Sequence, residues 1–289
     1  MAEFDYLFGY GDTGYADSDG AVEPVEAAAL PRALPFDVEG AVGADLYTRH
    51  DRIGGIDLYC GDCVPIMKAL PEGCIDMVLS DIPYGISFKS NHTTNHDYIA
   101  NDSFEDWTRN APVWLQEFHR VLSPTGVAVC CCGGGGSLPT AAFFTQMILD
   151  AGFYLVQTCI WDKKTIGLGW KYRPSYETIL VFSKSRDNYN WGKRRTNVSN
   201  IFRYNNVIPQ KDDHPTPKPV ALMRDLLRLH TEPDMLVLEP FSGGGTTALA
   251  CEQEGRRCIA TELVDKYYDI GLRRVWEEHA QGKLFTIDG

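Results

Sequence analysis

The feature that most constrains the fold is a short apolar run that ends in an acid and is soon followed by three glycines. Residues 235–239 read Met-Leu-Val-Leu-Glu, the glycines stand at 243–245, and the next stretch has helical composition up to Gly255. This order predicts a strand, a tight turn and a helix that ends at Gly255. Glycines let the backbone approach a ligand closely, and the start of the helix presents free N–H groups to an anion.

The next apolar run, 257–262, is a predicted strand that also ends in an acid. Glu262 follows Glu239 by 23 residues, close to the spacing at which an acid holds the ribose hydroxyls in dinucleotide folds. A nucleotide-binding unit of strand, helix and strand is therefore favoured. The turn reads Phe-Ser-Gly-Gly-Gly rather than Gly-x-Gly-x-x-Gly, which disfavours a Rossmann dehydrogenase.

A second polar segment follows another apolar run. Residues 75–80 read as a buried strand, and Asp81, Ile82, Pro83 and Tyr84 come directly after it. Ligands of open α/β sheets sit beyond the carboxyl ends of the strands, so we expect Asp81 to face a crevice. Its carboxylate and the carbonyl of Ile82, whose direction Pro83 restricts, can each accept a hydrogen bond from an amino group. Taken alone, the segment is also compatible with an ordinary turn.

Together, these segments resemble the motifs of S-adenosylmethionine-dependent DNA amino-methyltransferases, which methylate adenine N6 or cytosine N4. Residues 80–85 resemble the Asp-Pro-Pro-Tyr motif of that family, and residues 239–247 resemble its Phe-x-Gly-x-Gly cofactor motif. The catalytic motif comes first, as in the circularly permuted β group. Two departures stand out, since Ile82 replaces the usual first proline and Glu239 replaces the more usual aspartate.

The resemblance implies roles for individual residues. Catalysis would fall to Asp81, Ile82, Pro83 and Tyr84. Binding of S-adenosylmethionine would fall to Asp62, Cys63, Lys218, Glu239, Phe241, Gly243, Gly245, Thr246, Thr247 and Glu262. Lys218 is the expected partner of the methionine carboxylate. No metal is expected.

The expected reaction is methyl transfer to adenine N6 in double-stranded DNA, with the target base flipped out of the duplex and stacked on Tyr84. Asp81 favours adenine, because enzymes of this family that act on cytosine N4 often have serine there. Cytosine N4 remains the first alternative. An RNA methyltransferase, a protein-glutamine methyltransferase and an inactive DNA-binding module are further alternatives. Methylation of cytosine carbon 5 is disfavoured, because its nucleophilic cysteine follows a proline and none of the nine cysteines here does.

The formal net charge of −12 is unusual for a protein that binds DNA, but it is unevenly distributed. Residues 1–50 contain ten acids and two arginines and are interpreted as an acidic extension before a catalytic domain at 51–289. A local basic patch can bind DNA whatever the net charge. The expected DNA-binding residues are Lys184, Arg186, Lys193, Arg194 and Arg195. They lie in a candidate target-recognition insert, 184–213, whose shortness predicts a short or relaxed target sequence.

Composition and periodicity fit an α/β enzyme. The chain has 289 residues, 44% of them hydrophobic, with no apolar run long enough to cross a membrane and no signal sequence. We therefore expect a cytoplasmic protein with reduced cysteines, encoded by a bacterium, phage or prophage; a homodimer remains open. The expected fold is a doubly wound, mostly parallel sheet of the Rossmann-like methyltransferase type. Strands are predicted at 56–59, 75–80, 127–132, 154–161, 176–182, 235–239 and 257–262, and helices at 112–122, 139–150, 218–230, 246–254 and 264–279.

Overall fold

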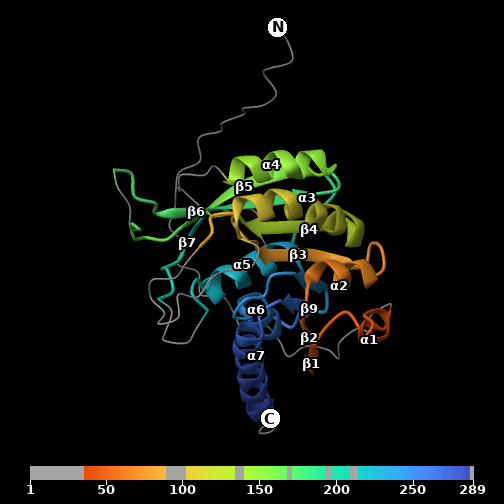
Figure 1. Ribbon diagram of the computed structural model, residues 1–289. Coiled ribbons are helices and arrows are strands. Elements are labelled where there is room, and N and C mark those ends of the chain that lie inside the picture. Colours follow the sequence, from red (N-terminus) through yellow and green to blue (C-terminus); the bar gives the residue numbers. More distant parts are fainter. Residues whose placement is uncertain are drawn as a thin grey trace. The chain divides into compact units, whose positions relative to one another are not determined.

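One mixed sheet organises the part of the chain that the computed structural model describes, which is residues 36–88, 102–133, 140–167, 171–192, 197–208 and 214–286 (Figure 1). Residues 31–289 form one compact unit. In chain order the elements are α1 (Val38–Ala41), β1 (Arg49–Ile53), β2 (Ile56–Cys60), α2 (Cys63–Ala69), β3 (Ile75–Asp81), α3 (Phe104–Val121), β4 (Leu122–Cys131), α4 (Thr140–Asp150), β5 (Tyr154–Asp162), β6 (Tyr176–Ser183), β7 (Ile201–Arg203), α5 (Val220–His230), β8 (Leu236–Glu239), α6 (Thr246–Gln253), β9 (Arg257–Glu262) and α7 (Asp265–Thr286).

The strand order is β1-β2-β9-β8-β3-β4-β6-β5-β7. Strands β2, β9, β8, β3 and β4 are parallel, whereas β6 runs antiparallel to both β4 and β5. From β3 the chain continues to β4 on one side, and from β8 it continues to β9 on the other. The loops that follow β3 and β8 therefore diverge, and this opens a crevice at the carboxyl edge of the sheet.

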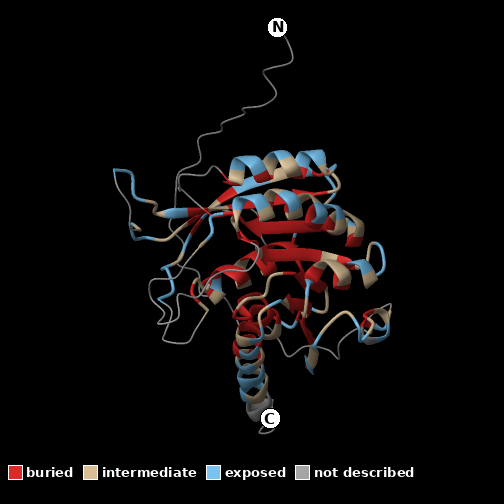
Figure 2. Cartoon of the chain, in the orientation of Figure 1, coloured by how far each residue is buried: buried red, intermediate tan, exposed pale blue. Residues whose placement is uncertain are grey.

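Side chains of the central strands point to both faces of the sheet, and each face packs against its own hydrophobic core. In β3, Ile75 and Val78 pack with the core residues of α2, α3 and α4, whereas Met77 and Leu79 pack with those of α5, α6 and α7. Because both faces are covered by helices, the central strands are apolar almost throughout, as expected for a buried parallel sheet. Figure 2 shows this buried layer between half-exposed helices.

The predicted doubly wound, mostly parallel α/β fold is confirmed, and each of the seven predicted strands is present within two residues of its expected start, apart from β4. That strand begins at Leu122 rather than at residue 127. The predicted start of the helix before it, residue 112, was wrong, because a proline is typical of a first helical turn but does not require one. In the structure Pro112 lies inside α3, and Ser103 caps the helix by accepting a hydrogen bond from the Asp106 amide.

Four short elements were not predicted, namely α1, β1, α2 and β7. β1 forms an antiparallel hairpin with β2, and Gly54 at the turn has a φ of +57°, in the left-handed region. Val38 and Val42, at the two ends of α1, are buried in the core on the face of α2 and α3. Both residues belong to the segment 1–50 that was interpreted as an extension, so the domain boundary at residue 50 stays a prediction. No helix in the described part of the chain is both long and apolar enough to cross a membrane.

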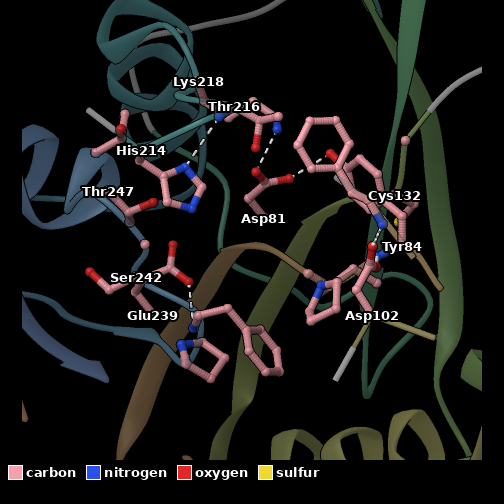
Figure 3. Close-up of a pocket in the computed structure, with 18 of the residues that line it drawn as sticks. Asp81, Tyr84, Asp102, Cys132, His214, Thr216, Lys218, Glu239, Ser242 and Thr247 are labelled. Atoms are coloured by element: carbon pink, nitrogen blue, oxygen red, sulfur yellow. Dashed lines mark hydrogen bonds and ion pairs between the residues drawn. The ribbon is translucent and has the colours of Figure 1, made fainter. Parts of the chain in front are cut away.

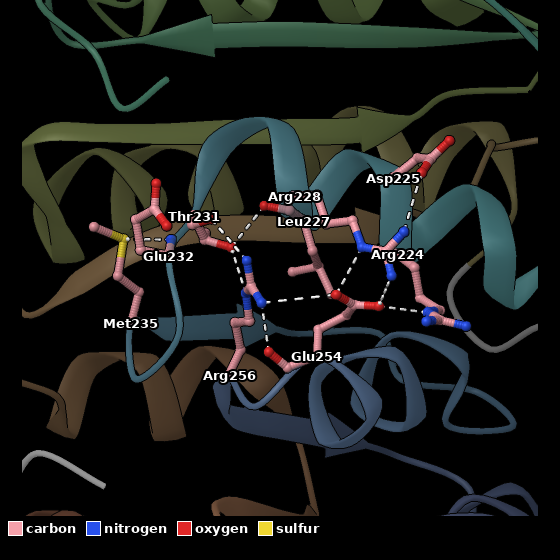
Figure 4. A network of polar contacts seen from close by, with 9 residues as sticks. All are labelled: Arg224, Asp225, Leu227, Arg228, Thr231, Glu232, Met235, Glu254 and Arg256. Atoms are coloured by element: carbon pink, nitrogen blue, oxygen red, sulfur yellow. Dashed lines mark hydrogen bonds and ion pairs between the residues drawn. The ribbon is translucent and has the colours of Figure 1, made fainter. Parts of the chain in front are cut away.

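A buried carboxylate joins α5 to the turn after α6 (Figure 4). The Glu254 side chain lies 2.5 Å from Arg224 and 2.7 Å from Arg228, both on α5. Arg256, which is 6% exposed, donates hydrogen bonds to Thr231 at the end of α5 and to the Glu254 carbonyl. This network fixes the helix pair that carries the glycine-rich turn on one side of the crevice.

Glu254→Ala should lower the free energy of unfolding by about 3 kcal/mol, because it leaves the guanidinium groups around it without their shared carboxylate. Urea unfolding monitored by circular dichroism measures this change. Glu105→Ala is the matched control, since Glu105 forms an exposed ion pair with Arg109 on α3 and should cost less than about 1 kcal/mol. Equal effects of the two substitutions would contradict a structural role for the network.

Candidate active site

A cavity of about 1080 Å³ lies at the carboxyl edge of the sheet, where the loops after β3 and β8 part. Its walls come from segments far apart in the chain: the turns after β2, β3, β8 and β9, the start of β6 and residues 214–218. All four predicted catalytic residues line it, as do the predicted cofactor-binding residues with the exception of Gly245. The fold thus brings the two polar segments of the sequence to one site.

The predicted catalytic segment, residues 81–84, is held in place by Asp102, which the sequence interpretation missed. The Asp102 carboxylate accepts hydrogen bonds from three backbone N–H groups, those of Tyr84 at 2.7 Å, Gly85 at 2.7 Å and Phe88 at 2.8 Å. Its carbonyl accepts a fourth from the Ser87 amide at 2.6 Å. Asp102 is 2% exposed, so this one side chain shapes the loop that follows Asp81.

The Asp81 carboxylate is held at both of its oxygens (Figure 3). Oδ1 accepts a hydrogen bond from the Tyr84 hydroxyl at 2.5 Å, and Oδ2 lies 2.5 Å from the Lys218 ammonium group. Burial raises the pKa of the Asp81 carboxyl above its ordinary value, while attraction to Lys218 opposes that rise. Burial also works against the charge on Lys218, but the neighbouring carboxylates outweigh it and raise the pKa of the ammonium group.

Glu177 adds a second buried carboxylate beside Asp81. It lies 2.6 Å from the Lys163 ammonium and 3.5 Å from that of Lys218, and the Tyr84 hydroxyl is 3.1 Å away. Burial alone would raise the pKa of Glu177, but the two lysines lower it below its ordinary value. The result is a cluster of two carboxylates and two ammonium groups in which each charge has a partner, the condition under which buried charges persist.

Glu239 occupies the end of β8, next to the strand that carries the catalytic segment. Its carboxyl group accepts hydrogen bonds from the Ser80 hydroxyl at 2.6 Å and from the Phe241 amide at 3.0 Å, and it is also hydrogen-bonded to Thr247. Burial raises the pKa of Glu239 to about 7. A cationic group bound in the cavity would favour the ionised form of this acid.

Glu262 fixes the glycine-rich turn from the end of β9. It accepts hydrogen bonds from the Gly243 amide at 2.7 Å and from the Val264 amide at 2.8 Å, which leaves lone pairs on both oxygens for hydroxyl groups. Burial raises the pKa of Glu262. Gly243 has a φ of +51°, and a Cβ atom there would lie 2.9 Å from the His214 ring, so the turn has no room for a side chain.

The remaining predicted cofactor residues divide into lining and supporting positions. Asp62 caps α2 by accepting a hydrogen bond from the Val64 amide at 2.9 Å, and Cys63 beside it is buried. The Phe241 ring packs edge-to-face on Trp114 at 4.7 Å between centroids, which forms an apolar wall. Thr246 and Thr247 are buried at the start of α6.

Gly245 was predicted to bind the cofactor, but the structure gives it a packing role. It has a φ of +74°, and a Cβ atom there would lie 2.6 Å from the Cα atom of Gly271 in α7. The absent side chain lets α6 and α7 meet closely. Gly245 does not line the cavity, and its contact with the cofactor stays a prediction.

Those of the predicted DNA-binding residues that the structure describes do not lie at the cavity. Because β6 runs antiparallel to β4, with Ser183 beside Val127, Lys184 lies at the edge of the sheet opposite the cavity. Its ammonium group donates to the Leu122 carbonyl at the start of β4. Arg186 follows on the same edge, and Lys193, Arg194 and Arg195 lie outside the described residues. Lys184 and Arg186 therefore lie away from the cavity, and their predicted contact with DNA stays a prediction.

Three polar residues of the site, Asp102, Lys163 and Glu177, were not among the predicted site residues. The sequence marks Glu177 and Lys163 only as ends of strands, and their meeting depends on the antiparallel pairing of β5 with β6. Asp102 directly precedes the Ser103 cap of α3, which was the available signal, but the expected start of that helix was placed too late.

The chain is similar to known proteins in family, sequence and fold. A family model described as DNA methylase, of the N6/N4 methyltransferases, matches residues 75–273. YubD of Escherichia coli (strain K12), a protein named as a methylase, is 30% identical over 232 residues, 74% of this chain and 88% of YubD. DNA adenine methyltransferase YhdJ of the same strain is 26% identical over 247 residues, 74% of this chain and 81% of YhdJ.

Two solved structures illustrate the similarity of fold. The PvuII DNA methyltransferase, described as cytosine-N4-specific, has a TM-score of 0.62 at 20% identity and covers 82% of this chain and 93% of its own. A Thermus thermophilus protein titled as a DNA modification methylase, complexed with S-adenosyl-L-methionine, has a TM-score of 0.59 at 24% identity and covers 77% and 95%. These TM-scores show a shared fold.

Asp102→Asn should slow the methyl transfer expected from the sequence by about tenfold to a hundredfold, because small displacements of reacting groups are costly. The amide can still accept two of the three backbone N–H groups, but its own NH₂ would face the third. Radiolabelled methyl transfer and cofactor titration measure the two functions separately, and cofactor affinity should change little. Glu105→Gln, at an exposed position in the first turn of α3, is the control; equal losses in both variants would contradict a positioning role.

Glu239 should make stability depend on pH. In the folded protein it is protonated up to a pKa of about 7, whereas it ionises near 4.5 when unfolded, so the folded state loses stability as pH rises through this window. The full shift corresponds to roughly 3 kcal/mol. Relative to wild type, Glu239→Gln should therefore gain stability between about pH 5 and pH 8. Urea unfolding at both pH values measures this, and a pH-independent difference would contradict the shift.

Proposed function

The chain belongs to the N6/N4 family of DNA methylases, which use S-adenosylmethionine, and we propose that it methylates N6 of adenine in duplex DNA. The observation that carries the proposal is the position of Asp81 at the carboxyl end of β3, inside the same cavity as the glycine-rich turn. A carboxylate there accepts a hydrogen bond from an exocyclic amine. The named adenine specificity of YhdJ, at 26% identity, agrees with this choice.

The residues around the glycine-rich turn fit S-adenosylmethionine. Glu262 offers free lone pairs to the ribose hydroxyls, the Trp114 and Phe241 rings offer an apolar wall to the adenine, and Glu239 offers a carboxylate to the methionine ammonium group. When bound, the cofactor supplies an electrophilic methyl group. The predicted contact of Lys218 with the methionine carboxylate stays a prediction, since in the structure its ammonium group is paired with Asp81.

Asp81 and the Ile82 carbonyl orient the amine in the proposed reaction. Each oxygen of Asp81 already accepts one hydrogen bond, from Tyr84 or Lys218, and retains a lone pair for the amine. The carboxylate stabilises the positive charge that develops on the amine nitrogen as the new N–C bond forms. Lys218 opposes the rise in pKa that burial causes at the Asp81 carboxyl, and the ionised carboxylate acts as a hydrogen-bond acceptor.

The target base has to leave the duplex to reach this depth, and the Tyr84 ring is the proposed stacking surface. The ring is backed by Gly133, where a Cβ atom would lie 2.8 Å from the ring, and the Thr140 hydroxyl holds the Tyr84 carbonyl at 3.0 Å. These contacts fix the plane of the ring before a base arrives.

Cytosine N4 methylation is the second candidate. It requires the same amine geometry, and the chain shares its fold with the cytosine-N4-specific PvuII enzyme. The carboxylate at position 81, where cytosine enzymes often have serine, is the feature that favours adenine. We further propose a short or relaxed target sequence, as expected from the length of the segment 184–213.

The test is methylation of plasmid DNA with S-adenosylmethionine, followed by mass spectrometry of the nucleosides. N6-methyladenine is the expected product, and N4-methylcytosine in its place would overturn the adenine assignment. If neither modified nucleoside formed, the proposed activity would be overturned. Asp81→Asn, which keeps the shape of the side chain but not its charge, should lower turnover by about a hundredfold or more. Cofactor affinity measured by calorimetry is the control and should remain near that of wild type.

A further inference from the structure

The connection between β5 and β6 extends the sheet beyond its carboxyl edge as a two-stranded projection. We call residues 163–167 and 171–175 the β5–β6 arm. Backbone hydrogen bonds join Lys163 to Ser175 at 2.9 Å and Gly167 to Pro174 at 2.7 Å, so the pairing of the strands continues past Asp162. Figure 1 shows the connection reaching outward from the ends of the two strands.

The arm borders the cavity and exposes its side chains to solvent. Lys163 and Pro174 line the cavity, whereas Tyr172 is 97% exposed and Ile166 is 61% exposed. A large aromatic ring so fully exposed gains nothing from packing within this chain. In Figure 2 much of this projection is pale blue, the colour of exposed residues.

The arm also concentrates positive charge in a chain whose net charge is −12. Lys164, Lys171 and Arg173 are all exposed. Within the described part of the chain, no acidic side chain is ion-paired with any of the three. The two acids at the base of the arm are already engaged, Asp162 with Arg203 at 3.6 Å and Glu177 with Lys163 at 2.6 Å.

Two residues of the arm have a left-handed backbone conformation. Lys164 and Lys171 have φ values of +57° and +63°, a conformation that is uncommon for residues with side chains and concentrates at functional sites. The Arg173 side chain donates from Nε to the Gly167 carbonyl at 2.6 Å, which fixes it across the arm. Its remaining guanidinium N–H groups stay available for an anion.

We propose that the β5–β6 arm is the surface that receives the target DNA beside the cavity, an inference that rests on the proposed function. Lys164, Lys171 and Arg173 contact phosphates next to the extruded base, and the Tyr172 ring contacts an exposed neighbouring base. A strongly acidic protein repels DNA at a distance, so an unpaired basic group at the cavity mouth gives both affinity and register. This location differs from that of Lys184 and Arg186, which lie at the opposite edge of the sheet.

The test compares two variants with the same change in charge. The arm variant carries Lys164→Gln, Lys171→Gln and Arg173→Gln; the control variant carries Arg52→Gln, Lys68→Gln and Arg273→Gln, which are exposed residues elsewhere. DNA affinity is measured by fluorescence anisotropy on a labelled duplex between about 50 and 200 mM salt. For the arm variant, the negative slope of log affinity against log salt concentration should be shallower by about three than for wild type. The slope for the control variant should resemble that of wild type.

Cofactor binding and a single variant separate the possible results. Both triple variants should bind S-adenosylmethionine as wild type does, and Tyr172→Ser should weaken DNA binding at least about fivefold without affecting the fold, since its side chain is exposed. Equal slopes for the arm and control variants, with DNA methylation by wild type intact, would overturn this inference alone. A wild-type protein that neither binds nor methylates DNA would overturn the proposed function together with it.

Discussion

The parallel contact between β3 and β8 is the constraint on which the site depends. The two strands lie side by side, with Met77 beside Val237, while the chain leaves their ends in opposite directions. The hydrogen bond from Ser80 to Glu239 joins them at 2.6 Å, one residue before Asp81. The predicted amine-binding segment and the glycine-rich turn, which are about 160 residues apart in the chain, thus meet across one strand spacing.

A second constraint is the balance between carboxylate and ammonium charges around Asp81. Placing the like charges of Asp81 and Glu177 together in this site is costly, and Lys218 and Lys163 offset part of that cost. Lys218 contributes to both pairs, at 2.5 Å from Asp81 and 3.5 Å from Glu177. The residue therefore connects the segment at 214–218, which borders the glycine-rich turn through His214, to the acid proposed to hold the target amine.

Local pattern predicted the parts of this structure that depend on local physics. The apolar runs before Asp81 and Glu239 indicated buried strands, and the glycines after Glu239 indicated the turn, because a tight turn before a helix requires them. The same reasoning does not reach partners that are distant in sequence. The close packing of Gly245 on Gly271 in α7 was not predicted, and Glu177 joins Asp81 only through strand pairing. Lys184 follows a strand whose antiparallel direction, not visible in its residues, carries it away from the cavity.

The most direct test of this account is a crystal structure of the protein with S-adenosylmethionine bound. The account predicts the ribose at Glu262, the adenine beside Trp114 and Phe241, and the methyl group directed toward the space in front of Asp81 and Tyr84. A cofactor bound elsewhere, or bound here with its methyl group directed away from Asp81, would contradict the claim that one cavity holds both reactants.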